Sequence, residues 1–130
     1  MPETIHSPVN ALSSADWFKA KLQFEMGPVE LDELMHEKRS IMVLDVRDAD
    51  SFGKEHIPGA VNIPLLDIPK RLAQIPKDKT IVTYCWSVTC HLATKAALDL
   101  AQREYKVLEM VGGIAEWKKN GLAVEGSRSA

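Results

Sequence analysis

The sequence predicts an α/β fold in which a central parallel sheet of about five strands carries helices on both faces. Short apolar runs alternate along the chain with segments whose apolar residues recur at helical spacing. Residues 41–44 (Ile-Met-Val-Leu) are uniformly apolar, which is typical of a central parallel strand covered on both faces. Residues 80–84 form a second strand-like run, and apolar residues at helical spacing follow from Leu92. Strands that alternate with helices in this way indicate a parallel sheet.

Residues 1–27 are predicted to be a leader that packs on the domain. Ser13 and Asp16 are typical of a capped helix start, so we expect a short helix there. Apolar and polar residues alternate over residues 21–26, which predicts a short, half-exposed strand. Gly27-Pro28 ends this pattern and opens the domain.

The domain is predicted to span residues 28–126, and residues 127–130 to form a flexible tail. Its expected elements, in chain order, are a helix at 29–35, the strand at 41–44, a short helix at 49–55, a brief strand within 61–64, a helix at 65–72, the strand at 80–84, a helix at 92–103, a strand at 107–111 and a helix from 114 that ends at Asn120-Gly121.

One thiol, Cys85, stands where the predicted strand 80–84 passes to the following helix. Backbone N–H groups of such a turn and of the first helical turn converge and favour negative charge. We therefore expect the pKa of Cys85 to be lowered, which would make the thiolate available as a nucleophile. The alternative is that Cys85 is a small buried apolar residue at a strand end.

Composition limits the range of functions. The chain has 130 residues, of which 45% are hydrophobic, and this suits one globular domain. A net charge of −2 without blocks of like charge gives no reason to expect a nucleic acid or a membrane as partner. No signal peptide or membrane-spanning run is visible, so we predict a cytoplasmic protein. Two cysteines in a reducing compartment indicate redox, sulfur or metal chemistry more than a structural disulfide.

Three groups of residues, in chain order, resemble the signatures of the rhodanese-like domain family over residues 28–126. The groups are Asp45-Val46-Arg47 with Phe52 and residues 56–60 and 62–64; Tyr84-Cys85; and Gly112-Gly113 with Trp117, Gly121 and Leu122. One group alone would be a weak signal, but their order and spacing together are specific. The resemblance implies a rhodanese-like fold.

The resemblance also implies a sulfurtransferase or persulfide carrier. In this family a cysteine, here Cys85, takes sulfane sulfur from a donor as a persulfide and passes it to a thiophilic acceptor. The implied partners are a small sulfur donor and a thiol or protein acceptor, with no cofactor and no metal. The implied substrate-binding loop consists of Trp86, Ser87, Val88, Thr89, Cys90 and His91.

The loop departs from the family pattern at one position. Family members that use thiosulfate usually carry arginine five positions after the cysteine, where this chain has Cys90. Without the guanidinium, capture of a small dianion should weaken, so thiosulfate is in doubt as donor. Cys90 has two interpretations: a resolving thiol that attacks a Cys85 persulfide, or a small residue that fills the space of the lost arginine.

Other residues have structural interpretations beside functional ones. Asp45 and Arg47 follow a predicted central strand, and we expect them to support the neighbouring loop as an ion pair or turn cap rather than to bind ligand. Trp86 is either a rim for an apolar donor or a ring that holds the loop in shape. His56 is expected to be a hydrogen-bonded turn residue.

Competing functions remain open at this point. They include a non-catalytic interaction module and a redox protein that uses a Cys85–Cys90 pair. A phosphatase or arsenate reductase of related fold would need arginine six positions after the cysteine, where His91 stands. A metal site formed by Cys85, Cys90 and His91 would have poor spacing and lack an obvious fourth ligand.

Overall fold

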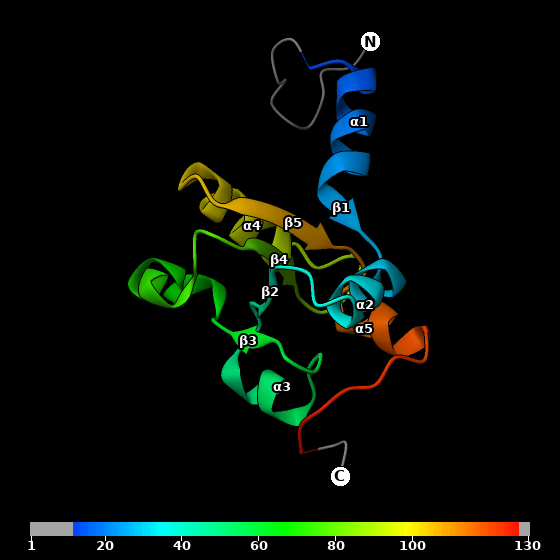
Figure 1. Cartoon of the computed structure of the whole chain (residues 1–130), viewed down its shortest axis with the longest axis vertical. Coiled ribbons are helices and arrows are strands. Elements are labelled where there is room, and N and C mark those ends of the chain that lie inside the picture. Colours follow the sequence, from blue (N-terminus) through cyan, green and yellow to red (C-terminus); the bar gives the residue numbers. More distant parts are fainter. Residues whose placement is uncertain (1–11, 128–130) are drawn as a thin grey trace, which may run out of the picture.

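The computed structural model describes residues 12–127, which form a five-stranded sheet with helices around it (Figure 1). The strand order is β1-β5-β4-β2-β3, and every paired neighbour is parallel. The strands are β1 (Glu25–Met26), β2 (Ile41–Asp45), β3 (Val61–Asn62), β4 (Thr80–Tyr84) and β5 (Lys106–Met110). This architecture confirms the predicted fold class.

Helices connect the strands. The α-helices are α1 (Ser14–Phe24), α2 (Pro28–His36), α3 (Ala49–Lys54), α4 (Leu92–Gln102) and α5 (Gly113–Lys119), and the 3₁₀ helices are η1 (Leu65–Lys70) and η2 (Leu72–Gln74). The predicted positions of α2, α3, α4 and α5 agree with these bounds to within a few residues.

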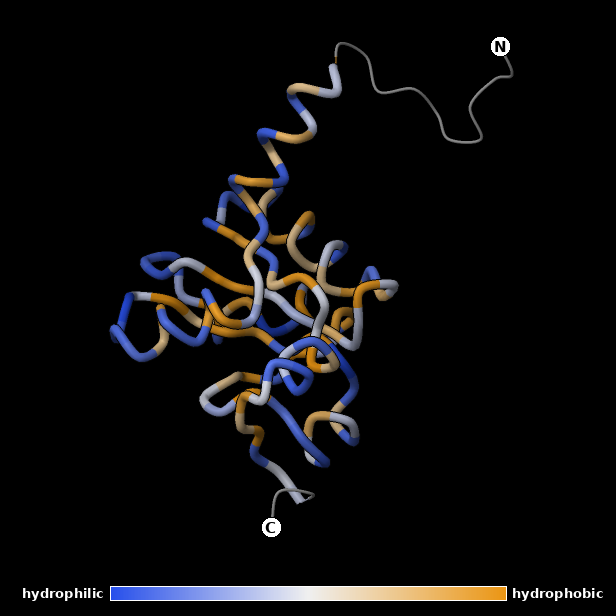
Figure 2. The backbone as a smooth tube through the Cα atoms, turned by 90° about the vertical axis from the view of Figure 1, so that its right-hand side faces the viewer, coloured by the Kyte–Doolittle hydropathy of each residue, from blue (hydrophilic) through white to orange (hydrophobic). Residues whose placement is uncertain are grey.

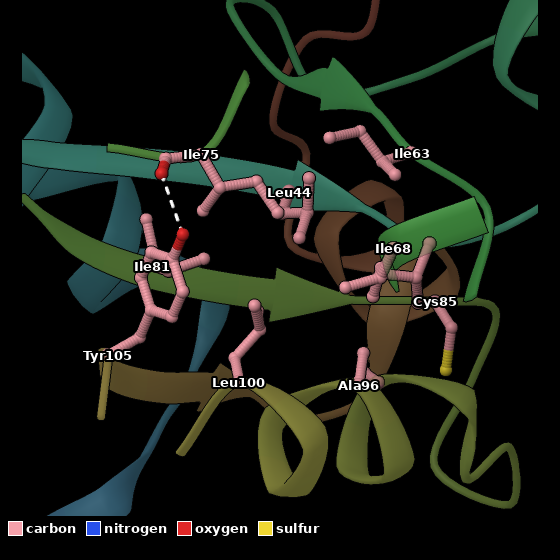
Figure 3. Close-up of a cluster of buried hydrophobic side chains, with 11 residues drawn as sticks. Leu44, Ile63, Ile68, Ile75, Ile81, Cys85, Ala96, Leu100 and Tyr105 are labelled. Atoms are coloured by element: carbon pink, nitrogen blue, oxygen red, sulfur yellow. Dashed lines mark hydrogen bonds between the residues drawn. The ribbon is translucent and has the colours of Figure 1, made fainter. Parts of the chain in front are cut away.

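One face of the sheet packs against α4 and the 3₁₀ segments. Ile81 and Leu44 from the central strands meet Ile68 of η1 and Leu100 of α4, all fully buried (Figure 3). The Tyr105 hydroxyl donates a 2.9 Å hydrogen bond to the Ile75 carbonyl within this cluster. Cys85 belongs to the same cluster and lies at one end of it, beside α4. Cys85, the candidate nucleophile, is therefore itself part of the buried core.

The other face packs against α2 and α5. Its buried cluster includes Leu31 of α2, Val82 of β4, Met110 of β5, and Ile114 and Trp117 of α5. Because the central strands bury side chains on both faces, their sequences are apolar throughout rather than alternating. The uniform apolar run at 41–44 was thus a correct signal for a central strand.

Two predicted elements differ from the structure. The strand expected at 21–26 is wrong, because α1 continues to Phe24 and only Glu25–Met26 pairs with β5. Lys19–Lys21 are good helix formers and the alternation beyond them is coincidental. The helix expected at 65–72 is two 3₁₀ segments that part at Arg71, since Pro69 lies inside the first segment and offers no N–H.

The helix α1 extends away from the rest of the molecule (Figures 1 and 2). A capping box starts it: the Ser13 hydroxyl accepts from the Asp16 N–H, and the Asp16 carboxylate accepts from the Ser13 N–H. None of its side chains is buried, and Leu22 is 86% exposed. Residues 1–11 of the predicted leader and 128–130 of the predicted tail lie outside the described residues, and the boundary at residue 28 stays a prediction.

Candidate active site

The site lies where β2 and β4 end at the same edge of the sheet. These strands are neighbours in register from Ile41 beside Thr80 to Asp45 beside Tyr84. The chain continues from β2 to β3 on one side and from β4 to β5 on the other, so the strand order reverses between them. Ligands of open α/β sheets bind at such a switch point, beyond the carboxyl ends of the strands. The loop of residues 85–91, which follows β4, occupies this position.

The first turn of α5 holds the loop from below. Ile114 N–H donates to the Cys85 carbonyl and Ala115 N–H donates to the Trp86 carbonyl, each at 3.0 Å. In a trans peptide the N–H points away from the carbonyl, so the N–H of Trp86 faces the other side, toward the thiols. Hydrogen bonds from Trp86 N–H and Ala93 N–H to the Cys85 sulfur act to lower its pKa. The loop therefore presents backbone donors to Cys85.

Gly113 permits this close contact. Its φ is +61°, and a Cβ there would lie 2.4 Å from the Trp86 carbonyl carbon and 2.6 Å from the Cys85 oxygen. Any side chain would displace the loop backbone. The sequence indicated a sharp turn at Gly112-Gly113, but it did not reveal that the turn packs under the loop, because the two segments are far apart in the chain.

The Cys85 thiol is almost inaccessible in the reduced protein. Its side chain is 3% exposed, and its S–H donates to the Cys90 carbonyl at 3.5 Å. Burial, followed by the hydrogen bond with the Cys90 thiol, raises the pKa of Cys85 to about 11. The predicted lowering of this pKa is wrong, because these two effects outweigh the N–H donors of Ala93 and Trp86.

Cys90 lies against Cys85. It packs on the cluster that contains Cys85, and its N–H donates to the Ser87 carbonyl at 3.0 Å, which closes the loop. Its half-burial raises the pKa of the Cys90 thiol, but hydrogen bonds from the Cys85 thiol and from the Trp86 and Leu92 N–H groups outweigh this effect and lower the pKa overall. A single negative charge shared by the two thiols therefore resides mainly on Cys90.

Asp45 and Arg47 form a fully buried ion pair next to the loop. The Arg47 Nη2 lies 2.7 Å from Asp45 Oδ2 and also donates to the Glu55 carbonyl at 2.7 Å. The guanidinium carbon is 4.6 Å from the centroid of the Trp86 ring, within range of a cation–π contact. Arg47 thus supports one wall of the loop through Trp86.

The remaining loop residues form the outer rim. The Ser87 and Thr89 hydroxyls are 3.3 Å apart, Val88 is 78% exposed, and Trp86 is partly exposed despite its contact with Arg47. His91 is exposed at the start of α4, where its carbonyl accepts the Lys95 N–H. The structure therefore brings Cys85 and Cys90 together at the base of the loop and leaves the other predicted loop residues around them.

Outside the loop, Glu109 adds a charge that acts on Cys90, whereas His56 belongs to a separate turn that pairs with Glu125. Glu109 of β5, half-buried, accepts a 2.8 Å hydrogen bond from Thr94 Oγ1 in the first turn of α4, and its charge acts to raise the pKa of Cys90. Sequence reasoning missed Glu109, although a carboxylate inside the apolar run 107–111 was a signal. The His56 ring stacks on the Phe52 ring with centroids 3.8 Å apart, and its Nδ1 forms a hydrogen bond with the Phe52 carbonyl. These contacts give His56 a structural role.

Between residues 12 and 127, no three His, Cys, Asp or Glu side chains converge in a way that could hold a metal ion. Over the same range, none of the helices has the length and apolar character needed to span a bilayer.

Comparison with known proteins agrees with this geometry. The family described as the rhodanese-like domain matches residues 27–120. The chain belongs to the rhodanese-like domain family. Membership confirms the resemblance seen in the sequence, and the site described above coincides with the strand end and loop that carried it.

Individual relatives extend the comparison. A sulfurtransferase of Allochromatium vinosum is 31% identical over 101 residues, which cover 77% of this chain and 92% of the relative. The crystal structure of the BH2092 protein from Bacillus halodurans superimposes with a TM-score of 0.82 at 36% identity, over 90% of this chain and 88% of that one. An HTH-type transcriptional regulator of Mycobacterium tuberculosis is 34% identical over 95% of this chain, which spans 48% of the regulator's length.

Proposed function

We propose that this rhodanese-like protein is a sulfurtransferase or persulfide carrier that holds sulfane sulfur on Cys85. The observation that carries the proposal is the position of the Cys85 sulfur at the base of the loop, where the N–H groups of Ala93 in the first turn of α4 and of Trp86 in the loop act to lower its pKa. These donors would stabilise the negative charge of a persulfide. Family membership and the relative named a sulfurtransferase support the same assignment.

The first step is transfer of sulfur from the donor to Cys85. The Cys85 thiolate attacks the donor's sulfane sulfur, a new S–S bond forms, and the donor's own bond breaks so that its remainder leaves with the electron pair. Cys85 must lose its proton for this step, and the adjacent Cys90 thiolate is placed to accept it. The persulfide sulfur then passes to an acceptor thiol.

The donor is proposed to be a polysulfide or a persulfide rather than thiosulfate. The family resemblance implies that Cys90 stands where members that use thiosulfate usually carry arginine. The exposed rim of the loop contributes Trp86, Val88 and Thr89. A rim of this kind offers apolar contact and few cations, which suits a donor of low charge better than a dianion. The acceptor is proposed to be a small thiol or a protein thiol in a reducing, cytoplasmic setting.

The test is sulfur loading of the reduced protein, followed by intact mass measurement. Inorganic polysulfide should add one sulfur atom to the Cys90→Ser protein, and peptide mapping should place it on Cys85. The Cys85→Ser protein, matched in side-chain size, should gain none. If Cys85→Ser loads as fully as the Cys90→Ser protein, Cys85 is not the carrier. If neither loads with polysulfide, thiosulfate or a persulfide donor, the proposed sulfur-carrier function is wrong.

A further inference from the structure

We infer that Cys90 resolves the Cys85 persulfide, so that the sulfur leaves as hydrosulfide while the loop closes in a Cys85–Cys90 disulfide. This inference rests on the proposed persulfide at Cys85 and assigns the protein a second activity, reductive release of sulfane sulfur. It uses Cys90, at the position where the family resemblance implies an arginine.

The two cysteines are in contact in the reduced protein. The Cys85 S–H donates to the Cys90 carbonyl at 3.5 Å, and the interaction between the two thiols raises the pKa of Cys85 and lowers that of Cys90. The turn from Ser87 to Cys90 brings the second thiol back over the first, where it packs on the cluster that includes Cys85. Both cysteines are free thiols, so the pair is available in its reduced form. Closing so short a loop costs little chain entropy.

The loop is anchored at one end and freer at the other. The Cys85 and Trp86 carbonyls are tied to α5, whereas the segment from Ser87 to Thr89 is at the surface and bonds mainly within itself. The anchored end keeps Cys85 in place, and the exposed end can adjust as the Cys90 sulfur approaches. The resolving thiol, Cys90, therefore follows directly after the freer part of the loop.

Protonation and access agree with these roles. Cys90 is the more acidic and the more exposed thiol of the pair, which suits it to attack. Cys85 is 3% exposed, so a bulky external thiol would reach its inner sulfur poorly. An intramolecular attacker does not have this difficulty.

Resolution exchanges one S–S bond for another. The Cys90 thiolate attacks the inner sulfur of Cys85–S–SH, a Cys85–Cys90 S–S bond forms, and the bond to the outer sulfur breaks. The outer sulfur leaves as hydrosulfide with the electron pair and keeps its proton. Two cysteine sulfurs are oxidised and one sulfane sulfur is reduced to sulfide. An external dithiol then attacks the more exposed Cys90 sulfur and returns the protein to the dithiol state.

The test loads the wild type, Cys90→Ser and the surface control Leu22→Ala, whose side chain is exposed on α1 away from the site, with one equivalent of polysulfide, and then removes all small thiols. Wild type and Leu22→Ala should release hydrosulfide without added thiol and end with the mass of the starting protein less two hydrogens. Cys90→Ser should keep the added sulfur and release hydrosulfide only after dithiol is added.

Two other outcomes would overturn the inference, and they are distinguishable. If Cys90→Ser loads sulfur but the wild type also retains it, with Cys90 still open to alkylation, the persulfide carrier stands and the resolving role fails. If no variant that keeps Cys85 loads sulfur, the proposed function fails and the resolving role fails with it. Non-reducing peptide mapping identifies the disulfide directly.

Discussion

At the scale of single residues, the site depends on Gly113. This glycine lies under the loop with a positive φ, and a Cβ would meet the Trp86, Cys85 and Ser87 backbone at 2.4 to 2.7 Å. Gly113→Ala should therefore destabilise the protein by about 1–3 kcal/mol and reduce loading of Cys85, because the loop backbone must move. Denaturant unfolding and intact mass after polysulfide treatment measure the two effects.

A matched control exists for that substitution. Gly53 lies in α3, and a Cβ added there would meet no atom outside its own helix within 4 Å, so Gly53→Ala should leave loading unchanged. The Gly53→Ala substitution should stabilise α3 slightly, since alanine is a better helix former than glycine. A Gly113→Ala protein that loads as well as Gly53→Ala would show that the loop tolerates displacement.

The two thiols should differ in reactivity in the order opposite to the one predicted from sequence. Burial raises the pKa of Cys85 to about 11, whereas the pKa of Cys90 is lowered overall, so Cys90 ionises first as the pH rises. At neutral pH, iodoacetamide should alkylate Cys90 before Cys85. The rate at Cys85 should rise about tenfold per pH unit until its pKa is reached.

Cys90→Ser provides the comparison for this prediction. Serine cannot carry the thiolate charge, so the pKa of Cys85 should fall and its alkylation at a fixed pH should accelerate. Alkylation of Cys85 ahead of Cys90 in the wild type would contradict the protonation order. Peptide mapping at several pH values gives both rates.

At the scale of elements, the loop of residues 85–91 combines backbone donors with a second thiol, Cys90, and carries no arginine. Cys90→Arg should raise thiosulfate turnover by roughly tenfold or more, because one charge-assisted hydrogen bond contributes about 1.5–3 kcal/mol. The gain should be in donor capture. Steady-state kinetics with thiosulfate separate KM from kcat.

Cys90→Gln is the control, since it adds a polar side chain without charge. It should leave thiosulfate turnover low. Equal kinetics for Cys90→Arg and the wild type would show that the backbone donors already do the work of the guanidinium.

The helix α1 has a strong start and little tertiary packing. Its capping box joins Ser13 and Asp16, yet none of its side chains is buried. Ser13→Ala should cost the helix about 1 kcal/mol. Because α1 packs so little on the domain, hydrogen exchange should accelerate within α1 while the global unfolding midpoint and sulfur loading stay constant. A fall in the midpoint would show that α1 contributes to the folded core.

At the scale of the whole molecule, the Asp45–Arg47 ion pair connects the sheet to the site. Both side chains are buried, at 0% and 1% exposure, and the guanidinium also contacts Trp86. Asp45→Asn leaves Arg47 charged and without its carboxylate in the interior, so unfolding should become easier by about 3–5 kcal/mol. Thermal and denaturant unfolding test this expectation.

The exposed pair Arg39–Glu37 is the matched control, with side chains 61% and 57% exposed. Glu37→Gln should change stability by less than about 1 kcal/mol, because solvent screens that pair. Equal effects of Asp45→Asn and Glu37→Gln would mean that the interior relaxes around the unpaired guanidinium.

The fold class, the central strands and the position of Cys85 at a strand-to-helix junction could be predicted from the amino-acid sequence. These depend on local patterns: uniform apolar runs, helical spacing, caps and turn residues. Local patterns also misled, since the alternation at 21–26 belongs to the end of α1 and Pro69 divides a predicted helix into 3₁₀ segments.

The protonation of Cys85 and the course of the loop depend on tertiary packing. The raised pKa of Cys85 follows from burial and from its contact with Cys90, and the course of the loop follows from α5 and Gly113 beneath it. Desolvation and close backbone approach depend on groups that are distant in the chain and meet only after folding. The sequence could therefore point to Cys85 as the proposed nucleophile, but the protonation of this thiol and its contact with Cys90 were set by packing.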